Sequence, residues 1–425
     1  MKRFLALMLV IVLLTASACS SAPKEKGNLD TAPAPTVVKD RTGYEVTDPM
    51  AYPDYTFEGD PDVMEIRATA VRAMRDLLSI RWSTAESFHY QKTGPISEKI
   101  FTHEKDTTYA GVLYSSASAG IFQFLEFYDH ETGRLYYPDG VSKMKKVIGA
   151  SCADALIWSW NTVVTSIDGL YYPNTMVYAN GYYPVGDYTY DFSVKNYSFL
   201  PTYTIIEQNG RDVILESYAK VLMADALVST SDNHGMMAIE NAHVVYKADG
   251  SIDSANSYIM IQDQRGGQGA GFYEVKEGGE IIRYSGRTSF KYTFDMLLSA
   301  NYIPVAPAEF LGTKKYEHAE VTCSAEKLET LADLTSATIS TNYPLALINA
   351  FLVYPDGGKV LIDRTTFNGD NRVGVPKTYE LNKMKHLVDG EFMSVLKEDN
   401  TYYVEIEVVV SNGTRHIAAK LPIDC

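Results

Sequence analysis

Cys152 is the residue of this chain best placed to act as a nucleophile. It follows small residues at positions 149–151 and precedes the segment 153–160, whose pattern predicts an amphipathic helix. This pattern predicts a tight turn into a helix, with the thiol in the first helical turn. The unpaired N–H groups and the positive end of the helix dipole there favour the thiolate, which is the nucleophilic form of cysteine. The alternative interpretation is a structural cysteine, because free thiols are commonly buried.

The number of cysteines supports a reactive Cys152. The chain has only four. Cys19 follows the apolar core of an export signal, and Cys323 and Cys425 lie in the last quarter of the chain, where they could form a disulfide. Cys152 is then the unpaired thiol of an exported protein, which indicates reactivity.

A cysteine nucleophile requires a base that accepts its proton, and the base requires an orienting partner. Among the eight histidines of the chain we favour His234, because it would open a strand directly after the polar loop 229–233 and project into a cleft. His243, which precedes an apolar triplet, is the rival. The remaining six are interpreted as surface or structural residues: His89, His103, His130, His318, His386 and His416.

The first 58 residues are expected to be an export signal and a tether. A short basic segment precedes the apolar run Phe4–Leu14, and small residues then lead to Cys19. This pattern predicts a signal peptide at 1–18, and the Ala-Ser-Ala-Cys junction is similar to a bacterial lipobox, in which the cysteine is lipidated. An ordinary cleaved signal peptide is the alternative. Residues 19–58 predict a flexible tether that lets a domain anchored on the extracytoplasmic face of the membrane reach the cell wall.

The composition excludes several classes of partner. A net charge of −15 argues against nucleic acid and against electrostatic binding to anionic lipids, so contact with the membrane is expected through the N-terminal lipid. The sequence has no P-loop, no G-x-G-x-x-G and no zinc-type spacing, and we expect neither a metal nor a cofactor. The glycine-rich stretch 266–271 is not followed by a helix pattern and is interpreted as a loop.

The order of the elements predicts an α+β fold. Apolar residues at helical spacing predict a long amphipathic helix within 60–83 and a shorter one within 119–128. Alternating apolar residues predict a hairpin of two strands, 202–207 and 213–218, around an Asn-Gly turn. The aromatic segment 171–201 is expected to form long loops near the site. Further short strands are expected at 226–228, 236–239, 243–246, 257–262 and 271–275.

The last hundred residues differ from the rest, because short strands alternate with turn signals and no helix pattern is present. The strands are expected at 337–341, 347–353, 359–363, 393–397 and 402–410. This pattern predicts a small antiparallel β-sandwich. We therefore expect one α+β domain at 59–316 and an all-β, sandwich-like domain at 317–425.

The first of these domains resembles the NlpC/P60 superfamily of papain-like cysteine hydrolases. The segment 151–156 stands where the family has its nucleophile, Asp225-Ala226-Leu227 stands where it commonly has Gly-Asp-Leu/Val, and 234–237 stands at its histidine strand. The segments 249–253 and 257–264 resemble the returning hairpin that carries the third polar residue. The usual Asp-Cys-Ser-Gly is Ser-Cys-Ala-Asp here, and about 80 residues separate the cysteine from the histidine, which fits a long insertion.

The resemblance implies a papain-like fold and a cysteine peptidase or amidase. Cys152 would attack a carbonyl carbon, and His234 would protonate the leaving amine. Asp263 would orient the imidazole, with Gln262 and Gln264 as alternatives because a register shift of one residue moves a side chain to the other face of a strand. Tyr114, at the place of the family's Gly-x-Pro-Tyr, would help the backbone N–H of Cys152 to hold the oxyanion.

The sequence therefore predicts an exported, lipid-anchored cysteine hydrolase that cleaves stem peptides of peptidoglycan. One alternative is a non-catalytic cell-surface binding protein built on a papain-like scaffold. A second alternative is an acyl or amide hydrolase that acts on a substrate outside the wall. The C-terminal domain would bind wall glycan or serve as a spacer.

Overall fold

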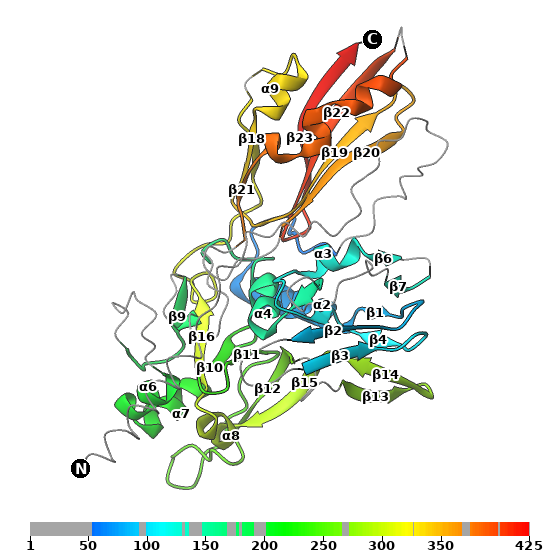
Figure 1. Cartoon of the computed structure of the whole chain (residues 1–425). Helices are drawn as coiled ribbons and strands as arrows, with labels where there is room; N and C mark the ends of the chain where they lie inside the picture. Colours follow the sequence, from blue (N-terminus) through cyan, green and yellow to red (C-terminus); the bar gives the residue numbers. More distant parts are fainter. Residues whose placement is uncertain are drawn as a thin grey trace, which may run out of the picture.

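A six-stranded antiparallel sheet forms the centre of the first two thirds of the chain in the computed structural model (Figure 1). The structure describes residues 53–92, 99–129, 132–135, 147–167, 176–177, 181–190, 201–265, 272–325, 327–367, 375–397 and 400–424. In spatial order the strands are β15 (Gly286–Thr293), β12 (Tyr258–Gln264), β11 (His234–Ala238), β10 (Ala226–Ser229), β16 (Ile303–Pro307) and β9 (Tyr182–Pro184). The architecture is mixed α+β and rich in strands, as the sequence predicts.

Two of the helices that pack against this sheet position the candidate site. The first is α2 (Val63–Ser79), which begins at an Asp62 capping box and buries an apolar face whose residues recur every three or four positions. The second is α4 (Cys152–Trp160), which contacts α2, β11 and β12 and is buried at every position. The helix expected within 60–83 is therefore confirmed, and so is the helix that begins at Cys152. The shorter helix expected within 119–128 is the single turn α3 (Ile121–Leu125).

A parallel pair of two-residue strands aligns the start of α4. In this pair β5 (Leu113–Tyr114) runs beside β8 (Gly149–Ala150), with Leu113 opposite Gly149. A Cβ atom at position 149 would lie 1.9 Å from the carbonyl oxygen of Leu113, so this approach requires glycine.

The remaining strands of this part form one sheet and two hairpins. The sheet contains β1 (Arg81–Trp82), β4 (Tyr109–Ala110), β13 (Tyr273–Glu277) and β14 (Glu280–Tyr284). The hairpins are β2 (Phe88–Lys92) with β3 (Lys99–His103), and β6 (Tyr128–Asp129) with β7 (Arg134–Leu135).

The hairpin expected at 202–218 is wrong. The segment forms two helices, α6 (Thr202–Asn209) and α7 (Arg211–Ala219). Gly210 has a φ of 86° and links the two helices, so the Asn-Gly pair ends a helix here instead of turning a hairpin. The short helix α8 (Phe294–Ser299) follows β15. The strand expected at 243–246 contributes only isolated bridges, and those expected at 226–228, 236–239, 257–262 and 271–275 correspond to β10, β11, β12 and β13.

The segment from Val321 onward forms two further antiparallel sheets. One contains β17 (Val321–Cys323), β18 (Thr338–Thr341) and β21 (Thr378–Glu380), and the other contains β20 (Lys359–Thr366), β19 (Leu345–Val353), β22 (Thr401–Val410) and β23 (Arg415–Asp424). Strand β23 was not expected, and the strand expected at 393–397 is wrong, because Glu391–Val395 form a 3₁₀ helix. Short helices also occur at Leu331–Thr335 (α9), Leu381–Lys383 (η4) and Lys385–Asp389 (α10).

Polar contacts join this second part directly to the helices of the first. The Gln123 amide of α3 donates to the carbonyl oxygen of Phe367 at 2.6 Å, and Ser411 donates to the carbonyl oxygen of Asn161 at the end of α4. Lys377 donates to the carbonyl oxygen of Thr165 at 2.9 Å. Hydrogen bonds thus connect the C-terminal sheets to α3 and to the end of α4. These contacts argue against a C-terminal domain that acts as a freely moving spacer.

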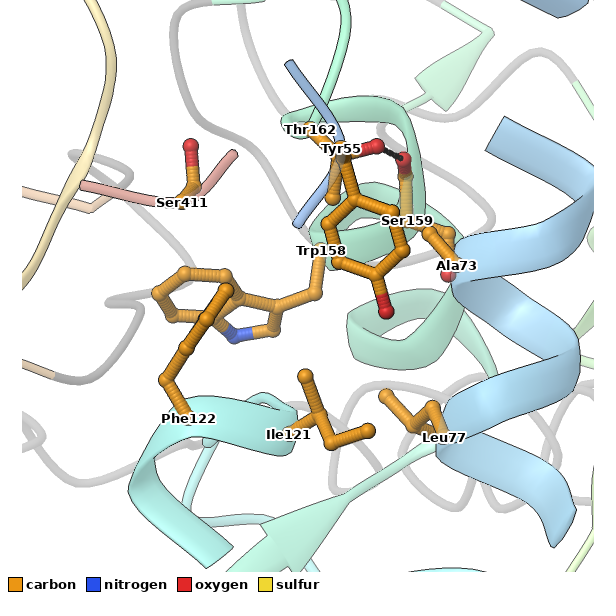
Figure 2. Close-up of a pocket in the computed structure, with 9 residues that line it drawn as sticks. All are labelled: Tyr55, Ala73, Leu77, Ile121, Phe122, Trp158, Ser159, Thr162 and Ser411. Atoms are coloured by element: carbon orange, nitrogen blue, oxygen red, sulfur yellow. Dashed lines mark hydrogen bonds between the residues drawn. The ribbon is translucent and has the colours of Figure 1, made fainter. Parts of the chain in front are cut away.

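A small pocket lies at this junction (Figure 2). Trp158 and Ser159 of α4 line it together with Tyr55, Phe122 of α3 and Ser411. Trp158 is six residues after Cys152, which is about 9 Å along a helix. The pocket therefore belongs to the packing between the two parts and lies away from the thiol.

A buried ion pair ties α2 to the sheet. Arg67 contacts the carboxylate of Asp225 at 2.7 Å, and both side chains are 1% exposed. The guanidinium also donates to the carbonyl oxygens of Met223 and Phe310, at 2.6 and 3.0 Å. Asp225, which stands in the segment that resembles the family's Gly-Asp-Leu/Val, therefore has a structural partner.

Replacing Arg67 with Met should lower the free energy of unfolding by about 3–5 kcal/mol, because it leaves Asp225 buried without its cation. The measurement is urea unfolding followed by tryptophan fluorescence. The double variant Arg67→Met/Asp225→Leu should recover most of the loss, since no buried charge remains. Arg75→Met, an exposed arginine of the same helix, is the control and should change the value by less than about 0.5 kcal/mol. An effect of Arg67→Met no larger than that of the control would contradict the assignment.

Candidate active site

Cys152 occupies the first position of α4, and the turn before it is fixed by a capping box. The hydroxyl of Ser151 accepts from the backbone N–H of Asp154 at 3.4 Å. In return the Asp154 carboxylate accepts from the backbone N–H and the hydroxyl of Ser151, at 3.0 and 2.6 Å. The thiol therefore lies in the first turn of a capped helix, as the sequence predicts.

His234 lies directly against this thiol. It is the first residue of β11, and Asn233 before it adopts a left-handed conformation with a φ of 47°. The thiol of Cys152 is close enough to the imidazole to raise its pKa. Since Nε2 of His234 is 2.7 Å from Oδ2 of Asp263, Nδ1 is the nitrogen left to face the sulfur. The sulfur is also 3.9 Å from the carbonyl oxygen of Asn233.

Asp263, on the neighbouring strand β12, completes a chain of three residues. Its carboxylate is fully buried and contacts both His234 and Arg287, whose Nε donates to Oδ1 at 2.8 Å and whose Nη2 donates to Oδ2. Burial alone would raise the pKa of Asp263, but the hydrogen bonds from Arg287 and His234 outweigh it and lower the pKa to about 2. Asp263 is therefore an anion under the imidazole at neutral pH.

The charges around His234 favour its protonated form. Burial acts to lower the pKa of His234, but the thiol of Cys152 and the carboxylate of Asp263 raise it to about 9. The imidazole is therefore protonated below about pH 9, including at neutral pH. An imidazolium next to a thiol stabilises the thiolate, which is the pairing that a cysteine nucleophile needs.

Tyr114 lies beside the start of α4. It stands opposite Ala150 in the β5–β8 pair, and Ala150 is two residues before Cys152. The carbonyl oxygen of Tyr114 accepts a hydrogen bond from the hydroxyl of Tyr90 at 3.0 Å. Burial and the nearby thiol of Cys152 raise the pKa of Tyr114. Its hydroxyl therefore keeps its proton at neutral pH and can act as a hydrogen-bond donor near the sulfur.

The structure separates the alternatives that the sequence left open. His243 is exposed and stacks on Tyr258, with ring centroids 4.6 Å apart, so it does not join this cluster. The amides of Gln262 and Gln264 donate to backbone carbonyls of α2 and of the segment before β5, at 3.0 and 2.8 Å. Of the three neighbours on β12, Asp263 is the one that contacts the imidazole.

Two arginines at this site, Arg287 and Arg265, were not predicted from the sequence. Arg287 is opposite Asp263 in the pairing of β15 with β12. Arg265 follows β12 directly, and its Nη1 is 3.9 Å from Oδ2 of Asp263. The separation of 24 residues between Asp263 and Arg287 hid their pairing, because no sequence signal specified which strand lies beside β12. The position of Arg265, two residues after Asp263, was the available signal.

The other histidines that the structure describes lie outside this cluster. His103 is buried against Trp82, Phe88 and Tyr109, while His89, His318 and His416 are exposed and His386 is half-buried. Their interpretation as surface or structural residues is confirmed. In the described part of the chain no group of three or more His, Cys, Asp or Glu residues could hold a metal ion.

Several expectations fall outside the described residues. They include His130, Cys19 with the signal peptide, the glycine-rich stretch 266–271, most of 171–201, and Cys425. The disulfide between Cys323 and Cys425 therefore stays a prediction, as does the lipid anchor. Over the described residues, no helix is both long and apolar enough to span a bilayer.

The chain matches no protein-family model and no curated protein.

Cys152 should react with iodoacetamide at about pH 6, where an ordinary thiol with a pKa near 8.5 is almost fully protonated. Peptide mass spectrometry would follow Cys152, and free N-acetylcysteine alkylated under the same conditions would serve as the reference. In His234→Ala the alkylation of Cys152 at this pH should fall by about tenfold or more, because the imidazolium is lost. Equal rates in the wild type and the variant would show that the two side chains do not form an ion pair.

Proposed function

We propose that this protein is a cysteine hydrolase that cleaves peptide or amide bonds. The observation that carries the proposal is the chain of contacts from Cys152 through His234 to Asp263. The cysteine begins a buried helix, the histidine lies on a strand packed against that helix, and the carboxylate lies on the next strand. This order of elements supports a papain-like fold of the NlpC/P60 type for the first part of the chain.

The reaction would begin at the thiolate. Cys152 attacks the carbonyl carbon of the scissile bond, and the oxyanion that forms is held by the backbone N–H of Cys152 and the hydroxyl of Tyr114. His234 transfers its proton to the leaving amine, and a thioester remains on Cys152.

Water then resolves the thioester. His234, now neutral, removes a proton from the water, which attacks the carbonyl carbon, and the carboxylic acid leaves while the thiolate returns. Asp263 keeps Nε2 of His234 engaged throughout, so that Nδ1 stays directed at the reacting atoms. Arg287 holds the Asp263 carboxylate in place from the opposite strand.

The proposed substrate is the stem peptide of peptidoglycan, and the proposed location is the extracytoplasmic face of the membrane. The export signal and the lipobox-like junction at Cys19 support this location. The acidic net charge fits a peptide better than a polyanion such as a nucleic acid.

Purified protein should release new amino groups from isolated muropeptides, and Cys152→Ala should release none, because the attacking atom is gone. Mass spectrometry of the products identifies the bond. Cys323→Ala is the matched control and should retain activity, since its thiol lies in the C-terminal sheets. Intact muropeptides together with turnover of small amides would move the substrate outside the wall. A fast-alkylating Cys152 with no turnover of either substrate would favour the binding-protein alternative.

A further inference from the structure

Arg265 is a second arginine at the Asp263 carboxylate, although that carboxylate is already satisfied. Both oxygens of Asp263 accept from Arg287, and Oδ2 also contacts His234 at 2.7 Å. The nearest nitrogen of Arg265 is 3.9 Å from Oδ2, which is beyond hydrogen-bond distance. Arg265 is therefore not needed to hold Asp263.

Most of the donors of Arg265 are unused among the residues that the structure describes. Its one side-chain hydrogen bond there runs from Nη1 to the hydroxyl of Tyr292, at 3.2 Å. A guanidinium carries five N–H donors in a planar fork. The side chain is 21% exposed, so it is partly withdrawn from water and still has a surface that faces solvent.

Arg265 has no carboxylate within hydrogen-bond distance among the residues that the structure describes. The carboxylate of Asp263 pairs with Arg287 and with His234. Asp232, on the loop before His234, accepts from the hydroxyl of Tyr302 at 3.0 Å. A guanidinium without a hydrogen-bonded carboxylate can pair with an anionic group of a substrate.

The guanidinium lies beside the Asp263 end of the catalytic cluster. Arg265 and His234 both approach the same oxygen of Asp263. Cys152 and Arg265 both affect the pKa of Tyr114. Burial and Cys152 raise this pKa, and Arg265 acts to lower it. Arg265 therefore borders the catalytic cluster at Asp263, where a group of a bound substrate can reach it.

We propose that Arg265 is a specificity-determining residue that binds a carboxylate of the substrate adjacent to the scissile bond. A guanidinium fork matches a carboxylate with two parallel charge-assisted hydrogen bonds, whereas a carboxamide offers one neutral acceptor. The protein then cleaves bonds flanked by a free carboxylate and discriminates against the amidated form of the same peptide. This inference rests on the proposed hydrolase function.

The test uses two synthetic stem peptides that differ only in a free carboxylate or a carboxamide beside the scissile bond. The wild type should cleave the carboxylate form with a kcat/KM about 10–100 times higher, the range expected for a charged hydrogen-bonding pair. In Arg265→Gln this ratio should fall to near one, mainly through a higher KM for the carboxylate peptide. Arg211→Gln, a surface arginine paired with Asp295, should keep the wild-type ratio.

Other outcomes overturn the proposal. If the wild type cleaves both peptides equally well, the proposed specificity is wrong. If Arg265→Gln lowers kcat equally for both peptides, the role of Arg265 is to position Asp263. Alkylation of Cys152 at about pH 6 shows whether the site of the variant is intact.

Failure of the proposed function is recognised separately. If the wild type cleaves neither peptide, calorimetric binding to Cys152→Ala decides: preferential binding of the carboxylate peptide that is lost in Cys152→Ala/Arg265→Gln supports the recognition role without catalysis. Equal binding of both peptides rejects it.

Discussion

The buried carboxylate of Asp263 is the point on which the arrangement of this site depends. An ionised carboxylate without contact with water is costly unless donors surround it, and here His234 and Arg287 supply them. The same contacts fix the imidazole, because Nε2 is engaged and only Nδ1 can face the thiol. A neutral residue at position 263 would leave Arg287 without its partner and His234 without its anion.

The scaffold brings these groups together through close packing of one helix against two adjacent strands. Helix α4 lies between the sheet, α2 and the C-terminal part of the chain, and all of its residues are buried. Its first turn is set by the capping box of Ser151 with Asp154 and by the pairing of β8 with β5, where only glycine fits at position 149. The contacts from Ser411 to the end of the helix hold its other end. The thiol is thus positioned by the whole fold.

Local patterns predicted the parts of the structure that depend on local interactions. The capped helix at Cys152, the helix of α2 and the strands that carry His234 and Asp263 all follow from short-range signals. The hairpin expected at 202–218 failed because an Asn-Gly pair also ends helices, and tertiary burial of Ile205 and Ile214 decided between the two. Arg287 was not found because its role arises from pairing between strands, which the sequence alone did not specify.

The most direct measurement of the central interaction is an NMR titration of the His234 ring in the wild type and in Cys152→Ala. With thiolate and carboxylate both present, the ring should remain protonated up to a midpoint of about pH 9. In Cys152→Ala the midpoint should move to lower pH, because the thiol is the larger of the two groups that raise it. The signals of the other histidines provide the internal control. A wild-type midpoint near 6.5, unchanged in the variant, would contradict an imidazolium–thiolate pair at this site.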